Sequence, residues 1–151
     1  VQYSQRAQHY DGSWGYQPKS PGDLSIVGWH MMGLRSGAAN KLNIDRGQIQ
    51  RVDHFLTTQQ SEGGARFGYR GSRPLPSMTA IGLLIRMYRG YPKTDPRLLD
   101  GARYLAANGP SPTDFYFNYY ASQVLFQLES PFWPNWNQQL REYLIQTQSR
   151  D

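Results

Sequence analysis

Apolar positions along this chain recur every three or four residues, the interval that places side chains on one face of a helix. The strongest run forms a stripe with an adjoining apolar flank, made of Ile81, Leu84, Ile85 and Tyr88 and of Leu83 and Met87. Ser77 stands where it can cap this helix. A helix that is apolar nearly all round is usually buried on both sides, so we expect this segment to lie between other elements.

The same spacing predicts five more helices. They cover residues 25–35, the segments from Asp45 to Gln59, from Asp95 to Leu105 and from Asp114 to Leu128, and residues 137–148. The last helix offers an apolar stripe made of Leu140, Tyr143, Leu144 and Thr147. Gly37 is expected to end the first helix, and residues 1–8 fit the polar end of an earlier one. The aromatic run 115–120 also fits a strand, but the helix formers that follow it favour a helix.

Two kinds of helix alternate along the chain. One kind carries an aromatic-leucine pair near its end: Phe55-Leu56, Tyr104-Leu105 and Tyr143-Leu144. The other kind carries a small residue before an apolar stretch: Gly28, Ala80 and Ala121. Short corners rich in glycine and proline join them, as in antiparallel helix pairs. We therefore expect one all-α domain over residues 1–151, made of about three antiparallel hairpins in an inner and an outer layer.

A glycine-rich corner occurs twice. Residues 8–16 and 60–69 each combine glutamine, glycine and aromatic residues, about fifty positions apart. Glycine permits a positive φ and a close backbone approach, and an aromatic ring supplies buried area that a short corner lacks. A period of this size is typical of repeat architectures, although two unrelated aromatic loops give the same pattern.

Composition narrows the classes of function. The chain has no cysteine, which excludes disulfides, thiolate nucleophiles and thiolate metal sites. Lysine and arginine number 16 against 11 aspartates and glutamates, for a net charge of +5, but the basic residues are scattered and form no nucleic-acid-binding stripe. No apolar run approaches the roughly 20 residues of a membrane span, and the compartment stays unidentified. The start at Val1 is typical of a segment excised from a larger protein.

The two corners share a pattern of glutamine, glycine and an aromatic residue: Gln8, Gly12 and Trp14 in the first copy, and Gln60, Gly64 and Phe67 in the second. The second copy is one residue longer and has phenylalanine in place of tryptophan. The pattern resembles the QW repeat of squalene and oxidosqualene cyclases, and Gln148 fits the glutamine of a third copy. More broadly, the chain is similar to the terpenoid cyclase and prenyltransferase superfamily. Its segments 22–29, 79–84 and 119–122 look closer still to bacterial squalene-cyclase-like domains.

This resemblance implies an α/α toroid, of which the chain would supply about three hairpins. In that family the glutamine of the repeat stacks on the aromatic residue and caps a neighbouring helix, which ties the outer layer together. The motifs therefore imply a structural brace at each corner. They imply nothing about chemistry at these residues.

The chemical motifs of the family are not matched. Its protonating cyclases use D-x-D-D-T-A, because forming a carbocation needs a strongly acidic carboxyl group. Thr79-Ala80 matches the last two letters, but residues 75–78 hold no carboxylate, and Asn118 stands where the second candidate segment needs an acid. The Asp, Cys and His zinc set of the prenyltransferases lacks its cysteine, and no histidine pair has helical metal-site spacing. We therefore expect no metal and no cofactor.

Polar and aromatic residues of the inner helices make a candidate pocket. Its members are Asp23, Trp29, His30, Tyr116, Asn118, Tyr119 and Tyr120. An aspartate at a helix start is also a common N-cap, and the aromatic residues also fit interhelical packing with hydroxyls bonded to the backbone. Both interpretations stay open at this point.

These observations favour a non-catalytic interaction or scaffold module with a squalene-cyclase-like fold. One alternative is part of a terpenoid-cyclase-like enzyme, or a polyprenyl-binding or lipid-binding domain, whose acidic motif lies outside this chain. A glycan-binding module that uses exposed aromatic residues is another. Candidate partners are a protein, neighbouring repeats or an apolar ligand, and exposed apolar edges on the first and last hairpins would favour self-association.

Overall fold

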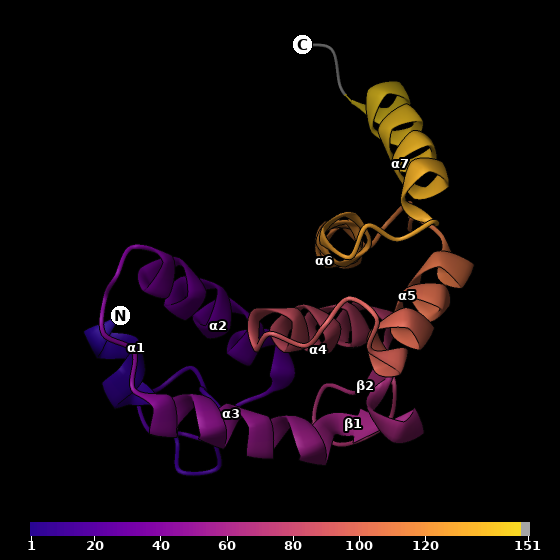
Figure 1. The fold of residues 1–151 in the computed structure, drawn as a ribbon. Coiled ribbons are helices and arrows are strands. Elements are labelled where there is room, and N and C mark those ends of the chain that lie inside the picture. The colour runs from indigo at the N-terminus through magenta and orange to yellow at the C-terminus, as the bar shows by residue number, and fades with distance from the viewer. Residues whose placement is uncertain (149–151) are drawn as a thin grey trace.

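Helices make up most of the regular structure in the computed structural model, which describes residues 1–148. They are α1 (Gln2–Ala7), α2 (Leu24–Ala39), α3 (Arg46–Gln59), α4 (Pro76–Tyr88), α5 (Pro96–Asn108), α6 (Phe115–Gln127) and α7 (Trp133–Thr147), as Figure 1 shows. Between α3 and α4 lie the antiparallel two-residue strands β1 (Gln60–Ser61) and β2 (Arg66–Phe67), separated by a 3-10 turn, η1 (Glu62–Gly64). The predicted all-α class is confirmed.

Helix α4 occupies the centre of the fold. It packs most extensively against α6 and α2, and it also contacts α5 and β2. Every residue from Met78 to Arg86 is buried, as the all-round apolar pattern of this segment predicts. Helices α2, α4 and α6 thus form one row, while α3, α5 and α7 pack beside α2, α4 and α6 respectively (Figure 1).

Glycine allows the elements around α4 to approach closely. A Cβ atom on Gly28 of α2 would lie 2.7 Å from the Ile81 side chain, and one on Gly101 of α5 would lie 2.4 Å from the Leu83 side chain. Such distances leave no room for even a methyl group. Gly28 and Gly101 therefore mark the points where α2 and α5 approach α4 most closely.

Aspartate side chains start four of the helices. Each accepts a hydrogen bond from a backbone N–H of the first turn, and together they are Asp23, Asp45, Asp95 and Asp114. The prediction that Ser77 caps α4 is wrong. Leu75 is the N-cap and makes no side-chain cap, while Pro76 takes the first helical position, where a missing N–H costs nothing.

Helix α2 is longer than predicted at its C-terminal end. It continues through Gly37 to Ala39, and the left-handed conformation that follows belongs to Lys41, with a φ of 61°. Gly37 serves close approach instead, because a Cβ atom there would lie 2.6 Å from the Val1 side chain. A glycine near a helix end therefore misled the prediction of where that helix stops.

Helix α7 differs from the prediction in its start and in its burial. It begins at Trp133 rather than at Asn137, because Pro134 fits the first turn of a helix. The expected stripe is not buried: among the helical residues only Trp136 is, and its indole Nε1 donates to Ser122 Oγ of α6 at 2.9 Å. The rest of this helix stays accessible.

The first corner is a brace built from a buried glutamine. Gln8 Nε2 donates to the carbonyl oxygens of Gly12 and of Gln48 in α3, both at 3.0 Å, and Gln8 Oε1 accepts from Arg51 Nε at 3.2 Å. Gly12 has a φ of 95°, and Trp14 is buried in a stack with His30 of α2. The corner thereby connects α1, α2 and α3.

The second corner repeats this geometry with different partners. Gly64 has a φ of 96°, nearly that of Gly12, and it likewise follows the glutamine by four positions. Gln60 Oε1 accepts from Arg86 Nη2 of α4 at 2.6 Å, and the buried Phe67 ring lies 5.0 Å from the guanidinium carbon of Arg86. This corner ties β1 and β2 to the central helix.

Candidate functional site

Four of the predicted pocket residues form an aromatic cluster between α2 and α6. Trp29 and Tyr119 stack with 6.3 Å between ring centroids, and they remain 53% and 47% exposed. Tyr120 is buried beneath them, edge-on to Trp29 at 6.0 Å and to Tyr119 at 5.1 Å. Tyr116 completes the set at 5.0 Å from Tyr120. We call these four residues the aromatic cluster.

Two hydroxyl groups of the aromatic cluster are buried. Those of Tyr116 and Tyr120 form no hydrogen bond with any described residue. A phenol is protonated at neutral pH, and burial raises the pKa of both these hydroxyls further, so each retains a proton to donate. The aromatic cluster therefore offers two exposed ring faces and two buried donors.

Asp23 serves as the N-cap of α2. The residue is fully buried, and its Oδ1 accepts from the backbone N–H groups of Ser25 and Ile26 at 3.0 and 3.2 Å. Its Oδ2 has no hydrogen-bond partner among residues 1–148. Asp23 is thus a capping residue in which one carboxyl oxygen accepts from the backbone and the other has no partner among the described residues.

His30 and Asn118 have packing partners of their own. The His30 ring stacks on Trp14 at 4.7 Å, and burial lowers the pKa of His30, which favours the neutral ring. Asn118 Oδ1 accepts from the backbone N–H of Ser111 at 2.8 Å, and its Nδ2 donates to the Ser111 carbonyl at 2.7 Å. Both side chains stabilise connections between helices.

A second candidate surface lies where the end of α7 meets the start of α6. It consists of exposed apolar side chains around a shallow cavity of about 330 Å³, and its residues are Phe115, Leu144, Ile145, Thr147 and Gln148. We call it the terminal surface. Phe115 is 53% exposed and Ile145 is 61% exposed. Pattern analysis found Leu144 but missed the other two apolar members, since each lies outside the apolar stripe of its helix.

The terminal surface is held in shape by Tyr143. The Tyr143 hydroxyl donates to the Pro112 carbonyl at 2.7 Å, and its ring lies 6.4 Å from that of Phe115. Two exposed side chains of opposite charge lie beside the terminal surface, on the adjacent residues Arg141 and Glu142 of α7. The surface is therefore apolar in the middle and mixed in charge at its edge.

Within residues 1–148, no group of three or more histidine, cysteine, aspartate or glutamate side chains could hold a metal ion. Over the same residues, each helix is too short or too polar to cross a bilayer. Comparison with family models, with curated proteins and with solved structures found no match to this chain.

Proposed function

We propose that this chain is a non-catalytic interaction module of the α/α-toroid type that pairs with a second copy of itself through the terminal surface. The observation that carries the proposal is the exposure of the C-terminal part of α7, where Leu144 and Ile145 remain largely accessible within residues 1–148. Exposed contiguous apolar surface on a folded domain usually marks an interaction site.

Burial of this surface would supply binding free energy. Fully burying an aliphatic side chain contributes about 1.5–3 kcal/mol, and here two neighbouring side chains remain roughly half accessible. Leu144 is 43% exposed and Ile145 is 61% exposed. Phe115 extends the same surface from α6, which gives a partner an aromatic contact as well.

We infer that the terminal surface pairs with a copy of itself. It combines an exposed apolar side chain, Ile145, with a shallow cavity that this side chain lines. Two copies related by a twofold axis would each insert this residue into the other, and twofold pairs are the commonest homo-oligomers.

Two features support the module type. The two rows of helices and the repeated glutamine brace fit a toroid framework. Asp23, the carboxylate that stands at the start of an inner helix, is already engaged with two backbone N–H groups, which supports a capping role over an acid catalyst.

Light scattering across a concentration series tests the pairing. We expect the wild-type chain to reach twice its monomer mass and Leu144→Gln with Ile145→Gln to remain monomeric. Leu99→Gln is a matched control, because Leu99 on α5 is 43% exposed, as Leu144 is. A wild-type chain that stays monomeric at every concentration, or a control that dissociates equally, would overturn the pairing.

Turnover of a polyprenyl substrate by the pure chain would overturn the non-catalytic role.

A second candidate function is suggested by the aromatic cluster. Its exposed Trp29–Tyr119 stack and two buried hydroxyl donors favour a polyprenyl or other lipid-like ligand with a polar end. Farnesol is a suitable probe, since it should change tryptophan fluorescence in the wild type and not in Trp29→Phe. Trp133→Phe is the control that must retain the change. A response unaffected by Trp29→Phe would dismiss this candidate.

A further inference from the structure

A cavity of about 350 Å³ opens between α2, α3 and α4, away from the terminal surface and the aromatic cluster. Its floor is apolar and comes from two helices and the loop between them: Met31, Leu34, Ile44 and Ile49. Met31 and Leu34 are buried, so the floor is part of the core. The volume falls within the range of small-molecule sites, which is about 300–1,000 Å³.

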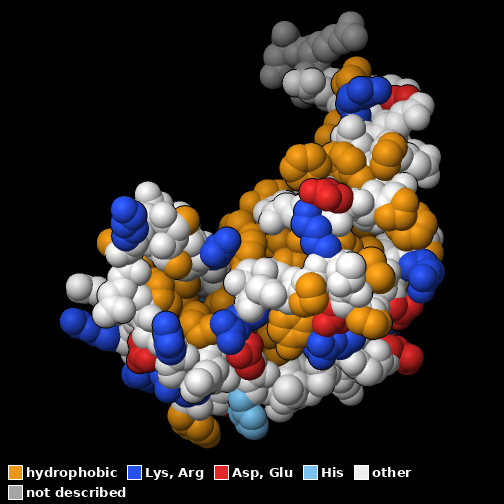
Figure 2. All heavy atoms as spheres, viewed as in Figure 1, with side chains coloured by type: hydrophobic (Ala, Val, Ile, Leu, Met, Phe, Trp, Pro, Cys, Tyr) orange, Lys and Arg blue, Asp and Glu red, His pale blue; other side chains and the backbone are white. Residues whose placement is uncertain are grey.

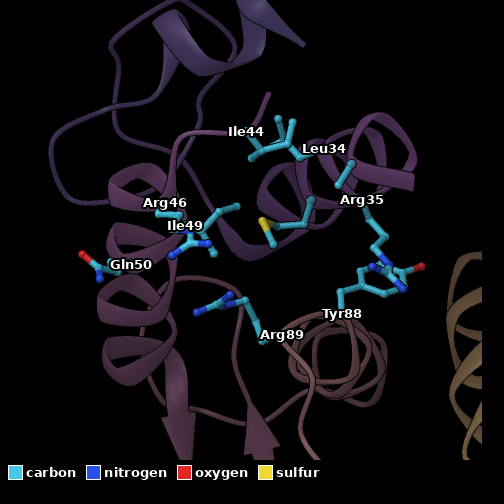
Figure 3. A pocket seen from close by; sticks show the side chains of 10 residues that line it. Leu34, Arg35, Ile44, Arg46, Ile49, Gln50, Tyr88 and Arg89 are labelled. Atoms are coloured by element: carbon cyan, nitrogen blue, oxygen red, sulfur yellow. The ribbon is translucent and has the colours of Figure 1, made fainter. Parts of the chain in front are cut away.

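The rim of this cavity is basic. Arg35 projects from α2, Arg46 from the first turn of α3 and Arg89 from the end of α4, so that three arginines surround one opening (Figure 3). In the space-filling view, apolar side chains lie in a hollow bordered by lysine and arginine side chains over the same helices (Figure 2). The arrangement combines an apolar floor with a cationic border.

Among the described residues, 1–148, one of the three arginines has its charge balanced by a carboxylate. Arg89 Nε and Nη2 donate to the two carboxylate oxygens of Asp53 at 2.8 and 2.7 Å. Arg35 and Arg46 form no ion pair with any carboxylate in residues 1–148. The N-terminus of the 14-residue helix α3 also lies here, but the Asp45 side chain already caps it by accepting from the Gly47 backbone N–H at 2.8 Å. Arg35 and Arg46 are thus the two charges at the opening that no carboxylate in residues 1–148 balances.

We propose that this cavity binds an amphipathic anion, a molecule with an oxyanion head of the carboxylate or phosphate type and an apolar body. The head contacts Arg35 and Arg46, whose guanidinium groups match such oxyanions in shape and charge. The body lies on the floor formed by Met31, Leu34, Ile44 and Ile49. Asp53 limits the affinity, because it neutralises the third arginine.

Methyl NMR titration provides the test, with Ile44 and Ile49 methyl groups as reporters of the floor. The probes are octyl phosphate, octanoate, inorganic phosphate and octanol. We expect both octyl anions to shift these methyl signals, and inorganic phosphate and octanol to bind at least about tenfold more weakly, since each lacks one half of the recognition. Inorganic phosphate or octanol binding as tightly as the octyl anions would overturn the proposal.

Charge variants test the rim separately. Arg35→Gln and Arg46→Gln should each weaken octyl phosphate binding about threefold or more, as expected for a partly exposed ion pair. Arg103→Gln, on exposed α5 surface, is the control and should change the affinity less than about twofold. Asp53→Asn should tighten binding, because it leaves Arg89 uncompensated.

The variants have clear contrary outcomes. Arginine variants that bind octyl phosphate as the wild type does, with unchanged methyl spectra before titration, would overturn the proposal. Asp53→Asn affinity equal to or below that of the wild type would contradict the part assigned to Arg89. Variants that lose self-association should bind octyl phosphate as the wild type does, since this cavity and the terminal surface share no residue.

Discussion

Gly12 lies where no other residue fits. Its φ of 95° is unfavourable for a side chain, and a Cβ atom there would lie 1.9 Å from the Arg51 carbonyl oxygen of α3. The close approach lets Gln8 reach the backbone of the same helix. One glycine and one glutamine thus fix the position of α3 against the N-terminal corner.

The close approach at Gly12 can be separated from its dihedral strain. Gly71 has nearly the same φ, 96°, but no described residue has an atom within 4 Å of its Cβ position. We expect Gly71→Ala to cost about 1–2 kcal/mol of unfolding free energy through strain alone. Gly12→Ala should cost about 2–4 kcal/mol, because the Arg51 carbonyl must also move. Urea denaturation measures both, and equal losses would contradict the brace.

At the scale of single elements, α4 is an apolar helix that other elements cover on several sides. Phe67 of β2 covers it at Gly82, where a Cβ atom would lie 2.4 Å from the phenylalanine ring. Thr79 Oγ1 accepts from the Phe67 backbone N–H at 3.1 Å. The second corner is therefore locked onto the middle of the helix.

Alanine at two helical glycines should have opposite effects. Gly82→Ala adds a methyl group against the buried Phe67 ring, and we expect a loss of about 1–3 kcal/mol. Gly33→Ala on α2 meets no atom of residues 1–148 within 4 Å and should gain about 0.5–1 kcal/mol of unfolding free energy through helix propensity. Thermal unfolding distinguishes them. A stabilised Gly82→Ala variant would show that Phe67 does not pack there.

The start of α5 makes stability depend on pH. Two hydrogen bonds from the Arg97 guanidinium to Asp95 lower the pKa of that carboxyl from 3.8 to about 2. Because the folded-state pKa is the lower one, this contribution is present above about pH 4 and is lost as the pH falls toward 2. Asp95→Asn keeps a capping side chain but cannot titrate.

The expected result is a smaller loss of unfolding free energy between pH 4 and pH 2 in Asp95→Asn than in the wild type. Urea denaturation at closely spaced pH values measures it. Arg97→Gln should approach the behaviour of the asparagine variant, since the lowered pKa depends on the guanidinium. Identical pH profiles for all three chains would contradict this account.

At the scale of the whole molecule, the helix pattern predicted the fold class and the central place of α4, because both follow from local spacing. The four aspartate caps were predictable for the same reason. The partners of the two corner glutamines were not. Arg51 and Arg86 lie in helices far along the chain, and a charged residue in a helix is usually exposed.

The candidate sites were less predictable than the fold. Sequence grouped His30 and Asn118 with the aromatic cluster, but their stacking and hydrogen-bond partners come from segments that pattern cannot pair. The stripe of α7 shows a different limit. Periodicity identifies which face of a helix is apolar, and it does not say whether another element covers that face.

Isotope-filtered NOE spectroscopy on an equal mixture of labelled and unlabelled chains tests pairing through the terminal surface most directly. We predict intermolecular contacts from the Ile145 methyl groups of one chain to Leu144 and Phe115 of the other, because the twofold pairing places each Ile145 in the opposite cavity. Intermolecular contacts confined to other faces, or none at concentrations where the wild type scatters as a dimer, would contradict the account.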